Sequence, residues 1–546
     1  MDNKTIARSF NMLGKLMDLH GENPFKIRSY YTAYNILRKQ ERPLVEMSTE
    51  EIEAINGLGK AISGKIEELK TKGYMDTLER YKQMTPPGII DMLTVRGFGP
   101  KKVSAVWNQL EITTVGELLQ ACNENRLVSL KGFGLKTQDS LKAKLKYFQS
   151  SKGFFHYADA INALEQIQTF IQDQMDGNAA IVGDAAKENQ VIEGITILVI
   201  EDFEDNIRAF IEENKDEEKE ELNVGGITVH LDAISQEEFA VEQLARNSTE
   251  EYIEYLQEEY EYEPEEYLDL LNEEAILEEL DVDYLSPPLR ELFDNKPSDR
   301  TEDNLIKAED IKGIVHSHST YSDGLHTLKQ MAEHCKKEGF EYLLITDHSQ
   351  TAFYADGLKP DKVIEQWKEI DELNENLGDF HIFKGIESDI LNDGSLDYEE
   401  EMLAGFDVVI ASIHSNLGMT EEKATTRLLN AIKNPYTKIL GHPTGRLLLS
   451  REAYPIDHAA IIDACAEHDV VIELNAHPNR LDIDYHWIDY CREKGVMISI
   501  NPDAHSREAI HMVQHGVRVA RKAYVIPEEN LSSLSIDDFK KRMKID

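Results

Sequence analysis

The spacing of apolar residues changes along the chain. Between residues 1 and 150, apolar positions recur at intervals of three and four, as in residues 7–19, which is typical of amphipathic helices. From residue 311 onward, short apolar runs such as 342–348 alternate with helical segments such as 328–338. This alternation predicts a parallel sheet or barrel with functional groups at the carboxyl ends of its strands. We therefore predict a helical amino-terminal part and an α/β carboxy-terminal part.

Three Gly-x-Gly turns punctuate the helical part. Their central residues are Leu58, Phe98 and Phe133, and each turn lies between an apolar segment and a predicted helix. This helix-hairpin-helix pattern lets backbone N–H groups and a helix N-terminus approach a phosphate, while nearby lysines attract the DNA backbone without reading sequence. Tight turns that only pack helices remain the alternative. The candidate DNA-binding residues are Gly57, Gly59, Lys60, Lys65, Gly97, Gly99, Lys101, Lys102, Gly132, Gly134 and Lys136.

Histidines and carboxylates follow the apolar runs of the second part. His316 and His318, at i and i+2, can share one face of a strand end. A single histidine there suits a hydrogen-bonded core residue, but a repeated pattern favours metal ligation by zinc, manganese or iron, with magnesium possible. Because the set exceeds one tetrahedral site, we expect two or three divalent ions. The candidate ligands are His316, His318, Asp323, His348, Glu387, His414, His442, Asp503 and His505.

These motifs (H-x-H, T-D-H, strand-Glu, strand-His, G-H-P and D-x-H) resemble those of the PHP (polymerase and histidinol phosphatase) domain across residues 311–525. The resemblance implies a distorted seven-stranded (β/α) barrel around a trinuclear centre that cleaves phosphoester bonds. Bound cations would acidify a water and stabilise the attacking and leaving oxygens. The resemblance also implies the ligand sets: His316, His318, Glu387 and Asp503 for one metal, Glu387, His414 and His442 for the second, and Asp323, His348 and His505 for the third.

Arg446 follows His442 in the segment GHPTGR. Its planar guanidinium could clamp a phosphate oxygen, which makes it a candidate catalytic residue. An ordinary surface arginine is the alternative.

The helical part resembles the amino-terminal portion of bacterial family X DNA polymerases. Residues 22–30 match the opening of their small DNA-end-binding domain. In eukaryotic relatives, a lysine on the helix after the first hairpin removes deoxyribose phosphate, and Lys65 occupies the matching position. Such a nucleophile needs a lowered pKa, so a phosphate-binding or solvated lysine is the alternative.

Residues 155–255 depart from that family. Its palm domain carries three aspartates that hold two magnesium ions for nucleotidyl transfer. Here Gly194, Thr196 and His230 occupy the matching places. Without such metals nothing stabilises the transferred phosphoryl charge, so we expect a palm fold without polymerase activity.

Charge is uneven along the chain. The whole chain has a net charge of −44, which by itself argues against a nucleic-acid partner. Residues 1–150 nevertheless carry 23 Lys+Arg against 17 Asp+Glu, whereas residues 201–300 carry 7 against 34. The basic helical part therefore remains compatible with DNA, and the acidic middle would repel a template and nucleoside triphosphates.

The remaining composition suggests an enzyme of the cytoplasm. No segment has the length and apolarity of a membrane span, the N-terminus lacks a signal-peptide pattern, and the four dispersed cysteines suggest free thiols. We expect a monomer. The expected domains are a small DNA-end-binding domain (1–85), a fingers-like domain with two hairpins (86–152), a degenerate palm (153–247), an acidic reduced thumb and linker (248–310) and the PHP domain (311–546).

The patterns predict a metal-dependent DNA-processing phosphoesterase, and the two resemblances imply a 3′-to-5′ exonuclease that acts on gapped, nicked or 3′-ended DNA in base excision repair, with AP endonuclease cleavage as an added activity. Three alternatives remain open: a gap-filling polymerase with a proofreading PHP nuclease, a DNA-binding scaffold with structural metals, and a small-molecule phosphatase.

Overall fold

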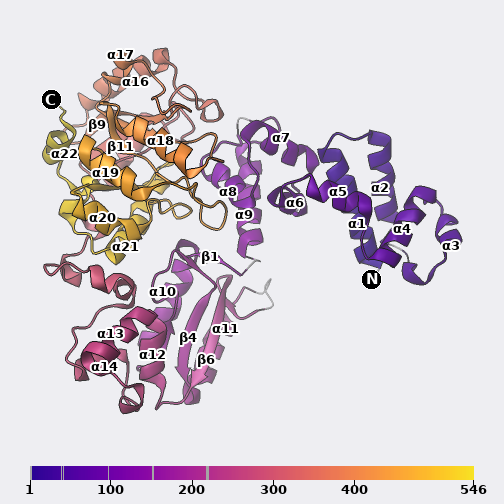
Figure 1. The fold of residues 1–546 in the computed structure, drawn as a ribbon, viewed down its shortest axis with the longest axis horizontal. Helices are drawn as coiled ribbons and strands as arrows, with labels where there is room; N and C mark the ends of the chain where they lie inside the picture. Colours follow the sequence, from indigo (N-terminus) through magenta and orange to yellow (C-terminus); the bar gives the residue numbers. More distant parts are fainter. Residues whose placement is uncertain are drawn as a thin grey trace. The chain divides into compact units, whose positions relative to one another are not determined.

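A computed structural model of the chain describes residues 3–38, 40, 42–95, 97–128, 130–150, 153–216 and 221–545. These residues form two compact units, Met1–Phe148 and Gln149–Asp546. Each unit has hydrophobic clusters of its own, so each is described separately (Figure 1).

The described residues of the first unit form helices joined by turns and loops, without a β-strand. Its buried side chains, among them Phe10, Leu13 and Leu118, come from the apolar faces that the sequence periodicity predicts. Side chains cap several helices: Asn23 accepts from the Phe25 N–H, and Thr114 and Glu117 form a capping box. The helices are α1 (Asn3–Leu19), α2 (Pro24–Leu37), α3 (Thr49–Glu53), α4 (Lys60–Lys72), α5 (Asp76–Gln83), α6 (Pro87–Thr94), α7 (Pro100–Leu110), α8 (Val115–Asn123) and α9 (Leu135–Ser150).

The second unit begins with a short antiparallel pair, β1 (Phe155–His156) and β3 (Val191–Ile192), and a four-stranded sheet of order β2-β4-β6-β5. Helices α10 and α11 contribute to its core, because Ile167, Ile171, Ile207 and Ile211 pack against the sheet. The other elements are β2 (Ala179–Val182), β4 (Ile195–Ile200), β5 (Asn223–Val224), β6 (Ile227–Ile234), α10 (Tyr157–Gln174), α11 (Glu204–Asn214) and α12 (Phe239–Asn247).

Two short acidic helices follow, α13 (Glu250–Tyr260) and α14 (Glu273–Glu279), and then the 3-10 segment η4 (Pro287–Asn295). The tyrosines of this region contribute to packing: Tyr252 and Tyr262 lie in a small hydrophobic cluster. The buried Arg290 guanidinium forms an ion pair with Glu273, 2.9 Å from Nη1 to Oε2.

Seven parallel strands form the sheet that dominates the second unit. They follow one another in sequence order across the sheet: β7 (Gly313–Ile314), β8 (Tyr342–Ile345), β9 (His381–Asp389), β10 (Val408–Ser412), β11 (Thr437–Leu440), β12 (Val471–Asn475) and β13 (Ile498–Asn501). The outer strands approach each other just beyond their carboxyl ends, because Ser317 and Ala504 form an isolated parallel bridge. The sheet is therefore a nearly closed barrel with a seam between β7 and β13.

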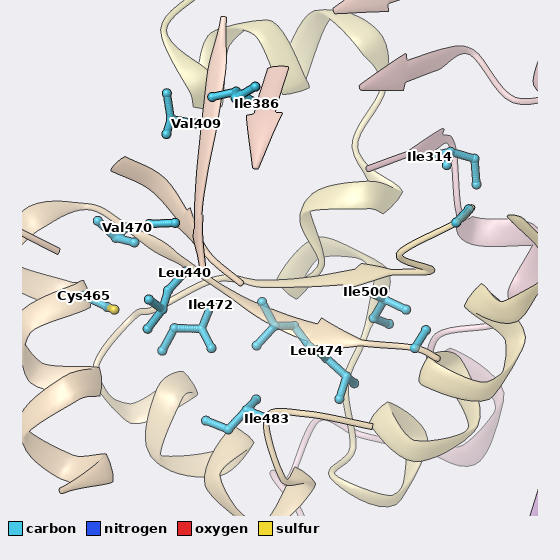
Figure 2. Packing of buried hydrophobic residues seen from close by; sticks show 14 of the residues in the cluster. Ile314, Ile386, Val409, Leu440, Cys465, Val470, Ile472, Leu474, Ile483 and Ile500 are labelled. Carbon is cyan, nitrogen blue, oxygen red and sulfur yellow. The ribbon is translucent and has the colours of Figure 1, made fainter. Parts of the chain in front are cut away.

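Helices pack on the outer face of this barrel, as α16, α18 and α19 do around β9 and β11 (Figure 1). Successive strand residues alternate between two clusters: Leu440 and Ile472 join the helix-facing core, whereas Ile439 and Val471 point inward. Figure 2 shows Leu440 and Ile472 near Cys465 of α19. The helices are α15 (Leu328–Lys337), α16 (Pro360–Asn374), α17 (Glu400–Leu403), α18 (Glu421–Ile432), α19 (His458–His468), α20 (Ile488–Glu493), α21 (Val513–Lys522) and α22 (Ile536–Met543).

Phe539 and Met543 of the C-terminal helix α22 pack with the inward-facing side chains of the barrel near the amino ends of its strands. Phe539 is fully buried there, with its ring centroid 4.6 Å from that of Tyr342 and 4.9 Å from that of Phe383. The inward side chains at the opposite ends of the strands are polar instead. The predicted helical amino-terminal part and the seven-stranded barrel are thus confirmed, and the described helices include none long and apolar enough to span a bilayer.

Candidate metal centre

The predicted ligands come together at the carboxyl ends of the barrel strands. His316 and His318 follow β7, His348 follows β8, and Glu387 lies within β9. The remaining ligands belong to the segments after β7, β10, β11 and β13: Asp323, His414, His442, Asp503 and His505. Parallel strands carry their carboxyl ends to one side of the sheet, which explains why residues far apart in sequence meet here.

Four overlapping groups of these residues have a geometry that can hold a divalent cation, since within each group the ligand atoms lie within 4.8 Å of one another. Glu387 belongs to two groups, which lets its two oxygens serve neighbouring ions. All nine predicted ligands are included. The groups are His318, Asp323, His348 and His505; His316, His318 and Asp503; His316, Glu387 and His442; and His348, Glu387 and His414.

The backbone holds two of these ligands in the sparsely populated left-handed region. The φ angle is +64° at His316 and +51° at Asp503. Such a conformation costs on the order of 1–3 kcal/mol for a non-glycine residue and persists where the surrounding structure enforces it. Here the Ser317–Ala504 bridge lies between them and fixes both segments.

Charge is concentrated at the centre of the cluster. Burial alone would raise the pKa of Glu387, but His414, His316 and His348 outweigh it and hold that pKa well below its usual range. Burial would likewise lower the pKa of His316, but neighbouring carboxylates, Glu473 foremost, raise it. Anionic oxygens and imidazoles are thus packed in a buried space where a cation would compensate the same carboxylates.

His318 and His414 differ in protonation. Burial, together with the nearby His505 and His348, lowers the pKa of His318 to about 4, so its ring is neutral near pH 7 and can donate a lone pair to a metal. Burial would lower the pKa of His414 too, but Glu387 and Asp389 raise it to about 10. A cation beside Glu387 would take over the role of that proton.

Several buried ligand atoms make no hydrogen bond among the described residues. They are Nε2 of His316, Nδ1 of His318, Oε2 of Glu387 and Nδ1 of His442. Leaving such atoms unpaired costs roughly 1–3 kcal/mol each. This donor set fits divalent cations that accept imidazole and carboxylate ligands, so the buried groups can hold such ions.

Two acidic residues of the site escaped the sequence prediction. Glu473, inside β12, has Oε1 at 2.5 Å from His316 Nδ1, and its Oε2 accepts the backbone N–H of His442 at 2.6 Å. Asp389, at the end of β9, lies 2.5 Å from His414 Nδ1. Both orient ligand imidazoles. The signal was present: residues 471–475 read Val-Ile-Glu-Leu-Asn, an apolar strand interrupted by a glutamate, as in the run around Glu387.

Arg446 is not among the residues that line the cation groups. Its Nε donates to the Arg480 carbonyl at 2.9 Å, and Nη2 donates to the carbonyl of Leu481 and to Gln190. Nη1 pairs with Asp484. A phosphate clamp would require these bonds to break. Arg480 lies closer to the ligands instead, with Nε 3.6 Å from Oδ2 of Asp503.

The three Gly-x-Gly turns share one geometry in the helical unit. Gly57, Gly97 and Gly132 have φ values of +93°, +83° and +94°. In each turn the N–H of the central residue donates to the carbonyl three residues earlier, at 3.0–3.1 Å, and the central side chain is buried. Gly59 and Gly99 are the N-cap residues of helices α4 and α7, and neither helix start has a side-chain cap, so N–H groups in the first turn lack a capping partner.

The predicted lysines surround these turns. Lys60, Lys101 and Lys136 are exposed at the starts of α4, α7 and α9. Lys102 lies with Lys136 around a cavity of about 230 Å³ beside Gly97 and Phe98. Lys65 donates to Thr77 Oγ1 at 2.7 Å, and Gly134, like Gly59 and Gly99, has open space around the position of a Cβ.

Comparisons with known proteins identify helix-hairpin-helix and PHP segments in the chain. The family model of the helix-hairpin-helix domain matches residues 1–75, and that of the SAM-like helix-hairpin-helix tandem matches residues 89–146. The family model of the PHP domain matches residues 315–477. The DNA polymerase/3′-5′ exonuclease PolX of Bacillus subtilis is 30% identical over 571 residues and covers 100% of both chains. The chain belongs to the bacterial PolX family. The predicted resemblance to family X polymerases with a PHP domain is thereby confirmed.

The barrel of this PolX-family chain also resembles smaller proteins. A probable phosphatase of Caldanaerobacter subterraneus is 27% identical over 241 residues, which cover 42% of this chain and 90% of the relative. A solved histidinol phosphate phosphatase from Lactococcus lactis, in complex with zinc, L-histidinol and phosphate, covers 39% of this chain with 19% identity and a TM-score of 0.31, too low to support a conclusion.

The four-stranded sheet carries the three positions that the sequence analysis compared with the metal-binding aspartates of a palm. Thr196 on β4 pairs in register with His230 on β6, and Gly194 immediately precedes β4. A Cβ at Gly194 would lie 2.7 Å from the Thr228 carbonyl oxygen and 3.1 Å from His230 Nε2, so a larger side chain would need the strand to shift. Among the described residues of 153–247, no group of three His, Cys, Asp or Glu side chains has a geometry suited to a cation.

Proposed function

We propose that this PolX-family protein is a metal-dependent phosphodiesterase that removes nucleotides from the 3′ ends of DNA, and that its palm no longer polymerises. One observation carries the proposal: nine histidine and carboxylate ligands converge in overlapping, buried, cation-sized groups at the carboxyl ends of a PHP barrel. The Bacillus subtilis relative, similar along its whole length, is named a DNA polymerase/3′-5′ exonuclease.

In the proposed mechanism the barrel holds two or three divalent ions, with zinc, manganese or iron suited to its ligands and magnesium possible. When bound, the ions supply an acidified water and stabilise the attacking and leaving oxygens of the phosphodiester. The contribution of the protein is to hold the metal ligands in position. Glu387 holds neighbouring ligand groups together, while Glu473 and Asp389 fix the rings of His316 and His414.

The cluster also determines which of the ligand histidines are protonated. His318, with its pKa at about 4, offers a neutral ring near pH 7, whereas His316 and His414 must release protons when a cation binds. We propose Arg480 as the arginine that meets a phosphate oxygen, because its Nε lies 3.6 Å from Oδ2 of the ligand Asp503.

The helical unit supplies the DNA contact in this proposal. The three turns share one backbone geometry and are flanked by exposed lysines, and two of them lead into helices, α4 and α7, whose first-turn N–H groups have no side-chain cap. Such groups bind the phosphate backbone without sequence preference, which suits gaps, nicks and 3′ ends. We propose a role in repair, with Lys65 contacting phosphate.

Loss of polymerase activity rests on three positions. Gly194, Thr196 and His230 replace the metal-binding aspartates, and the space beside Gly194 would not admit a carboxylate without movement. Asp232, two residues beyond His230, forms an ion pair with Arg246. Without ions there, nothing takes over the metal-ion role of stabilising the charge of the transferred phosphoryl group.

A primer-length assay tests both parts of the proposal. A 5′-labelled primer annealed to a longer template is incubated with protein, manganese and all four nucleoside triphosphates, and primer length is followed over time. We expect shortening that disappears in His316→Ala and Asp503→Ala. As a matched control, His468→Ala removes a histidine at the end of α19 that belongs to none of the ligand groups and should shorten primers normally.

Other outcomes separate the alternatives. Lengthening of the primer would mean that the palm polymerises and that the barrel proofreads. No change in length, with retained DNA binding, would favour a scaffold with structural metals. Hydrolysis of small phosphate monoesters without cleavage of DNA would favour a small-molecule phosphatase.

A further inference from the structure

A second group of potential metal ligands lies outside the barrel mouth. His334 and Glu338 are four residues apart at the end of α15, so their side chains project from the same face of the helix. His511 belongs to η9 (Glu508–Met512), the 3-10 segment after the loop that carries Asp503 and His505. The ligand atoms of His334, Glu338 and His511 lie within 4.8 Å of one another.

The contacts within this triad are loose for hydrogen bonds but close enough for a shared ion. His511 Nε2 is 3.9 Å from Glu338 Oε2, and the rings of His334 and His511 are nearly perpendicular, with centroids 6.1 Å apart. The other oxygen of Glu338 is 3.7 Å from Lys337 Nζ. One carboxylate oxygen therefore faces the two imidazoles, and the other faces the lysine.

One atom of the triad points to a ligand independently of this proximity. Nε2 of His334 is buried and makes no hydrogen bond with any residue that the structure describes. A buried ring nitrogen without a partner costs free energy that a hydrogen bond or a metal bond would recover. Because His334 lies beside the exposed Glu338 and His511, an ion could reach this nitrogen from solvent.

The triad lies where a bound ion would join the two sides of the barrel seam. Strands β7 and β13 end the sheet, and beyond them the seam is held by the Ser317–Ala504 bridge and by the N–H of Leu325, which donates to the His505 carbonyl at 2.8 Å. Helix α15 continues the β7 side of that seam and η9 continues the β13 side. A cation shared by α15 and η9 would therefore join the two sides.

We infer that His334, Glu338 and His511 form a peripheral zinc site that fastens the barrel seam, separate from the metal centre at the barrel mouth. Two imidazoles and one carboxylate are suitable zinc ligands, and a water completes a tetrahedron on the exposed side. The site stabilises the segment that carries Asp503 and His505 without contacting substrate. It does not depend on the proposed nuclease activity.

Counting bound zinc tests the site. Full-length wild-type protein and the variants His334→Ala and His511→Ala are each equilibrated by dialysis in buffered excess zinc, and zinc per chain is measured by plasma mass spectrometry. We expect each variant to bind one zinc fewer than wild type. We also expect the rise in Tm on zinc addition to be smaller in both variants than in wild type, because the ion no longer joins α15 to η9.

A control on the same helix excludes a general effect of surface charge. Glu333 is adjacent to His334 but belongs to none of the ligand groups, so Glu333→Gln should keep the wild-type zinc count. Glu338→Gln provides a third test if either histidine variant fails to fold by circular dichroism. Equal zinc counts in wild type and in every folded triad variant would overturn the inference, whatever happens to DNA cleavage.

Discussion

At the scale of single residues, the most informative side chain is one that binds no proposed metal. Glu473 is fully buried, and its two oxygens hold the His316 ring and the backbone of His442. Glu473→Gln removes the charge and replaces one acceptor by a donor. Because residues that orient ligands typically contribute about 10–100-fold in metal affinity, we expect DNA cleavage by the variant to need about that much more manganese.

The measurement for Glu473→Gln is a manganese titration of the initial cleavage rate. A high manganese concentration should restore most of the cleavage activity, because the residues that bind the metal directly are unchanged. Glu467→Gln, an exposed change on the preceding helix α19, is the matched control and should leave the titration unchanged. A variant with normal manganese dependence would show that Glu473 has no part in metal binding.

The difference between Glu473 and the predicted ligands shows what a sequence reveals about this site. His316, His414 and His442 were predictable because each follows an apolar run, where parallel strands expose their ends. Glu473 lies inside its strand, and its role depends on a histidine 157 residues away. The partners of Arg446 left no such pattern in the sequence, because the backbone carbonyl of Arg480 and the side chain of Asp484 come close to Arg446 only when the loops are folded.

At the scale of elements, the barrel depends on a helix from the end of the chain. Phe539 of α22 is fully buried against Tyr342 and Phe383 at the end of the barrel opposite the metal centre. Phe539→Ala leaves a cavity that α22 cannot easily fill, and such changes typically cost about 3–5 kcal/mol. We expect urea to unfold the second unit at a lower concentration while the metal dependence of cleavage by folded protein stays normal. Unchanged stability would mean that α22 does not support the barrel.

A second element gives a pH-dependent contribution to stability. His486 lies 2.6 Å from Asp484 and 3.2 Å from Glu291 of η4, and hydrogen bonds to these carboxylates raise its pKa to about 9. The ordinary value is about 6.5, so protonated His486 stabilises the fold fully below pH 6.5, and the contribution is lost as pH rises through 9. We expect Tm to fall across that interval more steeply in wild type than in His486→Gln. Parallel curves would exclude this contribution.

Some of these structural elements were predicted from the sequence, and others were not. The periodicities of residues 1–150 and of the strand–helix alternation indicated both units, because each element buries one apolar face. The seam between β7 and β13 was not visible in the sequence. It rests on two backbone hydrogen bonds, in which the N–H of His318 donates to the Ala504 carbonyl and the N–H of Ala504 donates to the His316 carbonyl, and these depend on chain geometry rather than on side-chain type.

At the scale of the whole molecule, binding and cleavage are assigned to different units. We propose that the hairpins of 1–85 and 86–152 hold DNA, that the PHP domain of 311–546 cuts it, and that the palm of 153–247 and the thumb of 248–310 contribute structure. The described residues from 153 onward belong to one compact unit, so the four-stranded sheet is part of the same folded body as the barrel. The separation of roles is testable because a small phosphodiester needs only the barrel.

Two glycine substitutions in the second hairpin separate folding from DNA contact. Gly97 has a φ of +83°, and a Cβ there would lie 3.3 Å from Lys144 Nζ, so Gly97→Ala strains the turn. Gly99 has an ordinary φ of −86° and open space around a Cβ, so Gly99→Ala changes only how closely a phosphate can approach. We expect both variants to bind DNA about tenfold more weakly, which is about the effect of losing one charge-assisted hydrogen bond. We expect only Gly97→Ala to lower Tm.

The decisive comparison is between DNA and a substrate too small to reach the hairpins. Dissociation constants for gapped DNA and rates of bis-p-nitrophenyl phosphate hydrolysis are measured for both variants and wild type at matched salt. Because the barrel is untouched, hydrolysis of the small ester should match wild type while DNA binding weakens. Equal losses on both substrates would instead mean that the hairpins act on the barrel through the fold. Normal DNA binding by Gly99→Ala would place the DNA contact away from this turn.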